Sequence, residues 1–152
     1  MSQYFLLGGD TVLWNPATGV ARLFLRQVPV FEAETGLPSG FGPMINDECE
    51  VDAAALEVFA NALLDHHRRT IHAIRAALSE GFVATAVTLA ERAGAALRWE
   101  APPDERARLR AELPAGSAEV VASAEDEGLR AMREMVRWLD GRMGPVTGWY
   151  DD

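Results

Sequence analysis

The placement of glycine and proline constrains the fold of this chain more than any other feature. Gly36, Gly81 and Gly94 each follow a stretch in which apolar residues recur with the period of an α-helix, and glycine commonly ends helices. Pro102 and Pro103 break the chain again before its last third. These signals predict helices over residues 16–35, 52–78, 82–93, 104–113 and 117–140.

Two short apolar runs near the N-terminus predict a β-hairpin. In YFLLGGDTVLW, residues 4–14, the runs flank the turn signal GGD. The stretch ALRWE, residues 96–100, is expected to add a third strand. At 152 residues the chain has the usual size of one domain. We therefore predict a mainly α (α+β) fold, a single helical domain over residues 1–152 with a small N-terminal β-hairpin or three-stranded sheet, and an irregular tail at residues 141–152.

The first predicted helix contains a proline in its interior. Asn15 is expected to cap this helix and Pro16 to occupy its first position. An interior proline removes a backbone hydrogen bond at a cost of roughly 3 kcal/mol, so Pro29 predicts a kink or a short break near Arg26. The apolar face expected for the helix comprises Val20, Leu23, Phe24, Val28 and Phe31.

The last predicted helix has an apolar stripe that includes a glycine. Gly128 would let another helix approach closely, so one hypothesis is a helix–helix seam between two copies, and hence a possible homodimer. The other members of the stripe are Val121, Met132, Met135, Val136 and Leu139.

Residues 36–51, GLPSGFGPMINDECEV, show no helical period. Their three glycines and two prolines predict a long loop, and loops of about 12–15 residues without regular structure are often functional. Asp52 is expected to cap the helix that follows. The apolar side chains of this segment either fix the loop on the core or form exposed anchors; they are Leu37, Phe41, Met44 and Ile45.

The negative charge of the chain is concentrated in one stretch. The net charge is −9, every basic residue is an arginine, and none lies between Arg26 and Arg68. Residues 27–67 therefore carry −8. This balance disfavours nucleic acid as a ligand, because phosphate contacts need a positive face. The acidic residues of the stretch are Glu32, Glu34, Asp47, Glu48, Glu50, Asp52, Glu57 and Asp65.

The combination of an acidic stretch with an apolar loop predicts a non-enzymatic protein-binding module. Apolar anchors inside an acidic rim suit a basic protein partner that is steered by charge. One version is an immunity or antitoxin-type inhibitor that covers the active site of a basic toxin. The residues expected to bind the partner are Glu32, Glu34, Phe41, Met44, Ile45, Asp47, Glu48, Glu50 and Asp52.

All three histidines fall within LDHHRRTIH, residues 64–72, and Asp-His-His is also the signature of a class of metal-dependent phosphoesterases. On a helical wheel with Leu56 at zero, His67 lies at about 20°, His66 at about 280° and His72 at about 160°. Three ligands of one ion must converge, and these diverge. The sequence therefore predicts no metal site.

His67 supports an alternative function. It falls in the middle of an apolar helix face, where a buried imidazole must find a hydrogen-bond partner, either as a core histidine or in a pocket. In the second case the chain would be a small enzyme or ligand-binding protein with a pocket near His67 and the loop 36–51. Asp47 or Glu48 could then form an acid–base pair with His67. The apolar face comprises Leu56, Phe59, Ala60, Leu63, Ile71, Ile74 and Leu78.

Several other kinds of site lack their motifs. Cys49 is the only cysteine, which excludes an internal disulfide, and no Gly-Lys-Ser/Thr phosphate loop or Gly-x-Ser-x-Gly elbow is present. We therefore predict no cofactor and no catalytic residue. No apolar run approaches the roughly 20 residues that span a bilayer, and the first residues do not form a signal peptide. These features predict a cytoplasmic protein without membrane association.

Two runs of the sequence resemble a known family. They are LWNPATGVARLFLRQVPVFEAETGLPSGFGPMINDECEVD, residues 13–52, and ALSEGFVATAVTLAERAG, residues 77–94. With the helix between them they resemble a family of small uncharacterised actinobacterial proteins, a domain of unknown function. The most specific motifs are GLPSGFGPM and NDECEVD. The resemblance implies a bacterial cytosolic protein, and it brings no established activity, ligand or catalytic residue.

Overall fold

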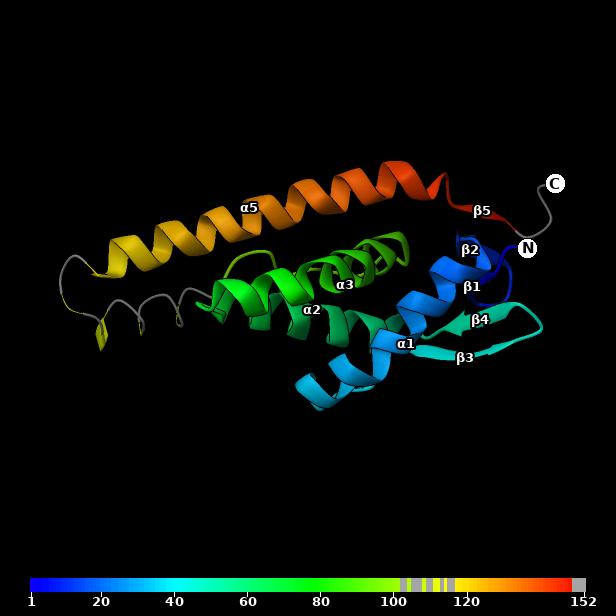
Figure 1. The fold of residues 1–152 in the computed structure, drawn as a ribbon, viewed down its shortest axis with the longest axis horizontal. Helices are drawn as coiled ribbons and strands as arrows, with labels where there is room; N and C mark the ends of the chain where they lie inside the picture. Colours follow the sequence, from blue (N-terminus) through cyan, green and yellow to red (C-terminus); the bar gives the residue numbers. More distant parts are fainter. Residues whose placement is uncertain (102–103, 105–107, 109–110, 113, 115–116, 149–152) are drawn as a thin grey trace.

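The computed structural model describes residues 1–152 except 102–103, 105–107, 109–110, 113, 115–116 and 149–152. It confirms an α+β single domain (Figure 1). The long helix α5 lies along the hairpin formed by α2 and α3, and the sheet lies at one end of these helices. The elements are β1 (Tyr4–Leu7), β2 (Thr11–Trp14), α1 (Thr18–Thr35), β3 (Phe41–Ile45), β4 (Glu48–Val51), α2 (Ala53–Arg69), α3 (Ala73–Arg92), α5 (Ser117–Met143) and β5 (Thr147–Gly148).

The sheet has five strands in the order β3-β4-β1-β2-β5, two more than the largest sheet expected. The predicted hairpin of β1 and β2 is confirmed, with Gly8 and Gly9 at φ 64° and 78° in its turn. β4 then pairs in parallel with β1, and β5 pairs with β2. Because α5 continues to Met143 and β5 uses Thr147 and Gly148, the prediction of an irregular tail over residues 141–152 is wrong for these residues, and the last four residues lie outside the described part.

The predicted loop over residues 36–51 is wrong for most of its length, because residues 41–51 form the antiparallel hairpin of β3 and β4. Asn46 and Asp47 form its turn, and both adopt a positive φ, at 52° and 65°. Two consecutive residues with positive φ are typical of the turn type that joins short antiparallel strands, and Asn and Asp tolerate this conformation best after glycine.

The predicted third strand at residues 96–100 is irregular in the structure. Its main chain is satisfied by side chains of α2 in place of a neighbouring strand. The amide of Asn61 donates to the Ala96 carbonyl at 3.0 Å, and its Oδ1 accepts from the Arg98 N–H at 2.7 Å. Glu57 accepts from the Ala96 N–H at 2.9 Å. The helix predicted over residues 104–113 lies mostly outside the described residues.

Helix α1 differs from the prediction at its start and along its buried face. Ala17 occupies the cap position without a side-chain hydrogen bond, so Asn15 is not the cap. The helix continues through Pro29 without the break expected as one outcome near Arg26. Its end at Gly36, with φ 70°, is confirmed. The buried residues are Ala21, Phe24 and Val28, whereas Val20 and Leu23, which were placed on the buried face, are exposed.

The helix predicted over residues 52–78 is two helices. Asp52 caps α2 as expected, with its Oδ1 accepting from the Ala55 N–H at 3.0 Å. The chain then leaves the helix at Thr70, whose hydroxyl donates to the His66 carbonyl at 2.7 Å. His72 begins α3 by accepting from the Arg75 N–H through Nδ1 at 3.4 Å. The helix expected at 82–93 is the second half of α3, and Gly81 lies inside it.

The core lies between the sheet and helices α1, α2, α3 and α5. Phe24 is central, since its ring contacts those of Phe5, Phe41 and Phe82 at centroid distances of 5.9, 5.1 and 5.1 Å. Among the described residues α3 is the one helix long and apolar enough to cross a bilayer by composition, and Phe82–Ala90 fills the core, with only Thr85 partly exposed. Over the whole apolar stretch 44% is buried, since Ile74 and Leu78 at its start are exposed.

Helix α5 buries part of its predicted stripe. Met132 and Val136 are buried, and Met135 and Leu139 pack against the core cluster. These side chains are therefore used within the chain, where α5 packs mainly on α3. The burial of Val121 and Gly128 lies outside the described part of the structure.

Candidate functional site

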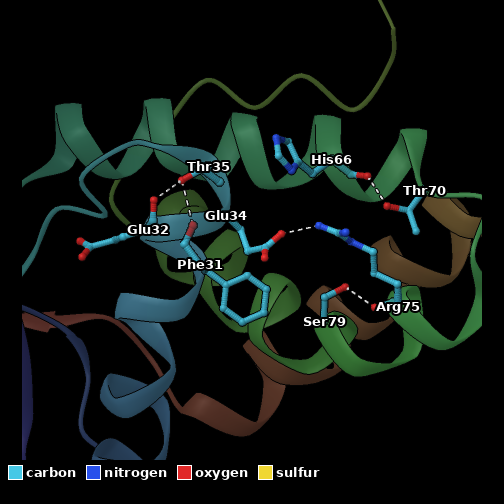
Figure 2. A network of polar contacts seen from close by, with 8 residues as sticks. All are labelled: Phe31, Glu32, Glu34, Thr35, His66, Thr70, Arg75 and Ser79. Atoms are coloured by element: carbon cyan, nitrogen blue, oxygen red, sulfur yellow. Dashed lines mark hydrogen bonds and ion pairs between the residues drawn. The ribbon is translucent and has the colours of Figure 1, made fainter.

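A pocket of about 450 Å³ opens between α1, α2 and α3. Each helix contributes one face to it, because the lining residues of each helix recur at intervals of one, three or four. Figure 2 shows several of the polar side chains around this opening, such as Glu34, His66 and Arg75, together with Phe31. The lining residues are Gln27, Val30, Phe31, Glu34, Thr35, Leu63, His66, His67, Thr70, Arg75, Leu78, Ser79 and Val83.

The floor of the pocket is apolar and rigid. Phe31 lies parallel to Phe82 with ring centroids 4.1 Å apart, which fixes α1 on α3. Leu63 and Val83 are both buried. In contrast, Leu78 is 80% exposed and Val30 is also exposed, although both line the pocket. Two aliphatic side chains thus stand at the mouth, where water contacts them and a ligand would cover them.

Most of the polar lining residues gather at one end of the pocket, whereas Gln27 lies about two turns of α1 before Glu34. Glu34 of α1 and Arg75 of α3 form an ion pair across the opening (Figure 2), which places the end of α1 beside the start of α3. Thr70 ends α2, only three residues before Ala73 begins α3, so it lies at this same end. Phe31, Leu63 and Val83 lie further along their helices. The pocket therefore has a polar end and an apolar end.

The Glu34–Arg75 ion pair is exposed. The side chains of Glu34 and Arg75 are 49% and 61% accessible to water. Such exposed pairs contribute about 0–1 kcal/mol, because water and salt screen the attraction. The pair is therefore a weak bridge across the mouth, and either member could exchange its partner for a ligand group.

His67 lines the inner side of the pocket and is half-buried. Its Nδ1 is enclosed and has no hydrogen-bond partner among the described residues. Burial lowers the pKa of His67 below its usual 6.5, because the charged imidazolium loses hydration, and the nearby carboxylate of Glu80 opposes this shift. At neutral pH the imidazole is therefore uncharged.

The proposed pairing of His67 with Asp47 or Glu48 is not formed. Asp47 accepts from the side-chain amide of Gln3 at 3.3 Å, and Glu48 lies in β4 opposite Tyr4 and Ile45. Helix α2 leads away from β4, so His67 lies about 22 Å along it from Asp52. The carboxylate that lines the pocket is Glu34. In the described part of the chain no three His, Cys, Asp or Glu side chains are grouped to hold a metal ion.

The acidic residues of the stretch 27–67, most of which were expected to bind a partner, serve several local purposes. Glu32 accepts from the N–H and hydroxyl of buried Ser39 at 2.8 and 2.7 Å, and so holds the turn after α1. Asp52 caps α2, and Glu34 pairs with Arg75. Asp65 forms ion pairs with Arg68 at 2.8 Å and with Arg98 at 3.5 Å. The acidic stretch is therefore divided between three elements and is partly neutralised.

The apolar residues that were expected to bind the same partner differ in their burial. Phe41 and Met44 pack against the core, whereas Ile45 is 61% exposed. In β4 the exposed Glu48 and Glu50 alternate with the buried Cys49 and Val51. Ile45, Asp47, Glu48 and Glu50 thus remain together on the β3–β4 hairpin. We call these four residues the hairpin surface.

Sequence reasoning named His67 as a pocket residue, but it assigned Glu34 to partner binding and expected the loop 36–51, none of which lines this pocket, to take part. It placed Ile71, Ile74 and Leu78 in the core, because the helical wheel was extended through Thr70. In the structure all three are exposed, Ile71 at 92%. The polar sequence Thr70-Ile71-His72, with a hydroxyl able to cap one helix and an imidazole able to cap the next, was the available signal of the break.

Comparison with known proteins assigns a family. Residues 1–140 match the family described as "Family of unknown function (DUF6086)". The match covers most of the chain, so the protein belongs to this family, and it extends the resemblance seen at residues 13–94 in both directions. No curated protein and no solved structure matches the chain.

Proposed function

We propose that this protein binds a small amphipathic molecule in the pocket between α1, α2 and α3. The observation that carries the proposal is the pocket itself, which combines a buried apolar floor with polar groups that converge at one end. Its volume of about 450 Å³ falls within the usual range for small-molecule sites, which are mostly apolar with a few placed polar groups.

The proposal is of binding without chemical conversion. The hydroxyl groups that line the pocket donate to main-chain carbonyls: Ser79 to Arg75 at 3.0 Å, Thr70 to His66 at 2.7 Å and Thr35 to Phe31 at 2.9 Å. In the described part of the chain, none of these three hydroxyl groups forms a hydrogen bond with a histidine side chain. A nucleophile activated by a neighbouring base, which covalent catalysis requires, is therefore not assembled there.

The experiment uses the neutral dye 1-N-phenylnaphthylamine, which fluoresces strongly in apolar sites. Wild-type protein should bind the dye with saturation at one site per chain. The variant Ser79→Phe, which places a ring in the pocket, should reduce dye affinity by about tenfold or more. The matched control is Ala77→Phe, which adds the same ring on the exposed side of α3 and should leave affinity unchanged.

The proposal fails if wild-type protein shows no saturable fluorescence with the dye. It also fails if Ser79→Phe and Ala77→Phe bind the dye equally well. Circular dichroism of both variants shows that the helices are retained, so that lost binding is not misread as lost folding.

A second candidate function is binding of a basic protein partner by the hairpin surface. In support, the exposed Ile45 lies on the edge strand β3 opposite Glu48 of β4, and Glu50 is exposed two residues further along β4. As a cytoplasmic immunity or antitoxin-type inhibitor, the protein would use Ile45 as the anchor and the acids to steer a cationic partner.

This second function is tested by capture from the native host. A basic protein should be retained by wild-type protein and lost with the double variant Glu48→Gln/Glu50→Gln. Equal retention by the double variant would exclude the hairpin surface. Neutralising Asp52 instead is uninformative, because Asp52 caps α2 and its loss destabilises the helix.

A further inference from the structure

One end of the pocket is mainly apolar and the other carries charged and polar side chains. This difference restricts the kind of ligand that the pocket can bind. The apolar end is formed by Phe31, Leu63 and Val83, and Gln27 also lines it, with its side-chain amide donating to the Leu23 carbonyl. The opposite end holds Arg75 and the imidazoles of His66 and His67. A ligand that fits both ends must itself have an apolar body and one polar head.

The charged groups near the polar end decide the sign of that head. Residues 66–79 contain three arginines and no acidic residue, although Asp65 and Glu80 flank the segment and Arg68 is paired with Asp65. The guanidinium of Arg75 presents a planar set of N–H donors. Its Nη2 donates to the carboxylate of Glu34 on α1. The positive end of the α3 dipole lies here as well, because α3 starts at Ala73.

The negative ends of two other helices point toward the same region, but several carbonyls in their last turns already accept hydrogen bonds. Thr70 donates its hydroxyl to the His66 carbonyl and its N–H to the His67 carbonyl, at the end of α2. Thr35 donates its hydroxyl to the Phe31 carbonyl at the end of α1, and the Gly36 N–H donates to the Glu32 carbonyl. A cationic head would therefore have Glu34 as its charged partner and would face the guanidinium of Arg75.

We propose that the ligand is an amphipathic carboxylate, whose head replaces Glu34 on Arg75 while its aliphatic or aromatic body fills the apolar end of the pocket. This proposal rests on the small-molecule function proposed above. The exchange conserves an ion pair on Arg75, and a guanidinium binds a carboxylate through two parallel N–H donors. Glu34 is half-exposed, so its carboxylate can return to water when it is displaced.

Burial of Val30 and Leu78 by the ligand would also favour binding. Both are exposed although they line the pocket, and Leu78 lies one turn of α3 after Arg75. A ligand held by Arg75 would extend past these side chains toward Val83 and would remove their apolar surface from water. The head and the body of the ligand are thus bound by consecutive turns of the same helix.

The test uses three probes that share one chain: decanoate, 1-decanol and decylammonium. Each is titrated against protein that holds 1-N-phenylnaphthylamine, below the concentration at which the probe forms micelles. Decanoate should displace the dye at roughly tenfold lower concentration than decanol, and decylammonium should be the weakest of the three.

Two variants assign the selectivity to residues. Arg75→Met should remove the advantage of decanoate over decanol, so that the two probes displace the dye at similar concentrations. The matched control is Arg130→Met on α5, also an exposed helical arginine, which should behave as wild type. Glu34→Gln should strengthen decanoate binding several-fold, because it removes the carboxylate that competes for Arg75.

The outcomes separate the two proposals. If the dye binds but the three probes displace it equally, the small-molecule function stands and the carboxylate proposal is overturned. Preferential displacement by decylammonium, or weaker decanoate binding in Glu34→Gln, overturns it as well and indicates a cationic ligand. If wild-type protein does not bind the dye, both proposals fall.

Discussion

Arg92 contacts Asp140 through both the side chain and the main chain of the aspartate. Its Nε donates to Oδ1 of Asp140 at 2.7 Å, and its Nη2 donates to the Asp140 carbonyl at 2.8 Å. The same guanidinium donates to the carbonyls of Leu13 at 2.7 Å and Gly144 at 2.6 Å. One arginine side chain, 6% exposed, therefore joins the end of α3 to β2 and to the end of α5.

Replacing Arg92 should destabilise the protein strongly. Arg92→Met leaves three carbonyls, of which that of Leu13 is in a partly buried hydrogen bond, and one carboxylate without their donor, so the free energy of unfolding should fall by about 2–4 kcal/mol. Arg92→Lys should recover only part of this loss, because an ammonium cannot reach four acceptors in a planar arrangement. Urea unfolding measures both changes.

The control for Arg92 is Arg130→Met, since Arg130 is exposed on α5. Its effect on the free energy of unfolding should stay within about 0.5 kcal/mol, as for most surface substitutions. An Arg92→Met protein as stable as the Arg130→Met protein would show that the four hydrogen bonds of Arg92 do not join these elements in solution.

Glu32 and Glu34 lie two residues apart on α1 and should respond differently to the same substitution. Glu32 binds both donors of Ser39, which is fully buried, so Glu32→Ala should cost about 1–3 kcal/mol. Glu34 pairs with an exposed arginine, so Glu34→Ala should cost at most about 0.5 kcal/mol.

Thermal unfolding of the two variants provides the comparison, because each serves as the control for the other. The sequence hypothesis gave both glutamates the same role in binding a basic partner. Equal small losses of stability would support that shared role and would contradict the structural role of Glu32 at the turn before β3.

Local backbone signals in the sequence predicted local structure correctly. Asp52 caps α2, Gly36 ends α1, and the pair Gly8-Gly9 turns the first hairpin. In each case the chemistry of one or two residues determines a conformation within a few residues of them. Such signals do not depend on the rest of the fold.

The second hairpin could not be predicted in this way. In FGPMINDECEV the prolines and glycines resemble a loop, and Pro43 lowers the strand propensity further. The strands form because β4 pairs in parallel with β1, more than forty residues earlier in the chain. Pro43 is tolerated because β3 is an edge strand, where one row of N–H groups needs no neighbour.

The pocket was missed for a related reason. Its existence depends on the break between α2 and α3, where Thr70 and His72 satisfy the ends of two helices. A helical wheel extended through this break assigned Leu78 to the core. Once α3 turns back along α2, Leu78 stands at the mouth of the pocket, and Arg75 reaches Glu34 on α1.

Gly40 should be the least replaceable glycine among those that the structure describes. Its φ is +85°, and a Cβ at this position would lie 2.6 Å from the Asp52 carbonyl oxygen and 2.8 Å from the Leu56 nitrogen. Gly40→Ala should therefore destabilise the protein by about 3 kcal/mol or more, because the obstacles are main-chain atoms at the start of α2.

Gly36 provides the control for Gly40. It has a similar φ of +70°, but a Cβ added there would meet no atom within 4 Å, so Gly36→Ala should cost only about 1 kcal/mol. Chemical unfolding of both variants isolates the effect of the close approach from that of the backbone conformation. Equal losses would mean that the contact between Gly40 and the start of α2 is relaxed in solution.

The buried imidazole of His67 predicts a loss of stability in mild acid. Burial lowers its pKa in the native state below 6.5, so between these two values the unfolded chain binds a proton that the native protein does not. The free energy of unfolding should therefore fall as the pH decreases through about 6.5, and level off below the native pKa. Urea unfolding at pH values from 7.5 to about 5 measures this slope, which His67→Gln should reduce. The control is His66→Gln, which removes an exposed imidazole one residue away and should retain the slope. If His67→Gln leaves the slope unchanged, another group takes up the proton. The imidazole of His67 would then be in contact with water in solution, although its Nδ1 is enclosed in the structure.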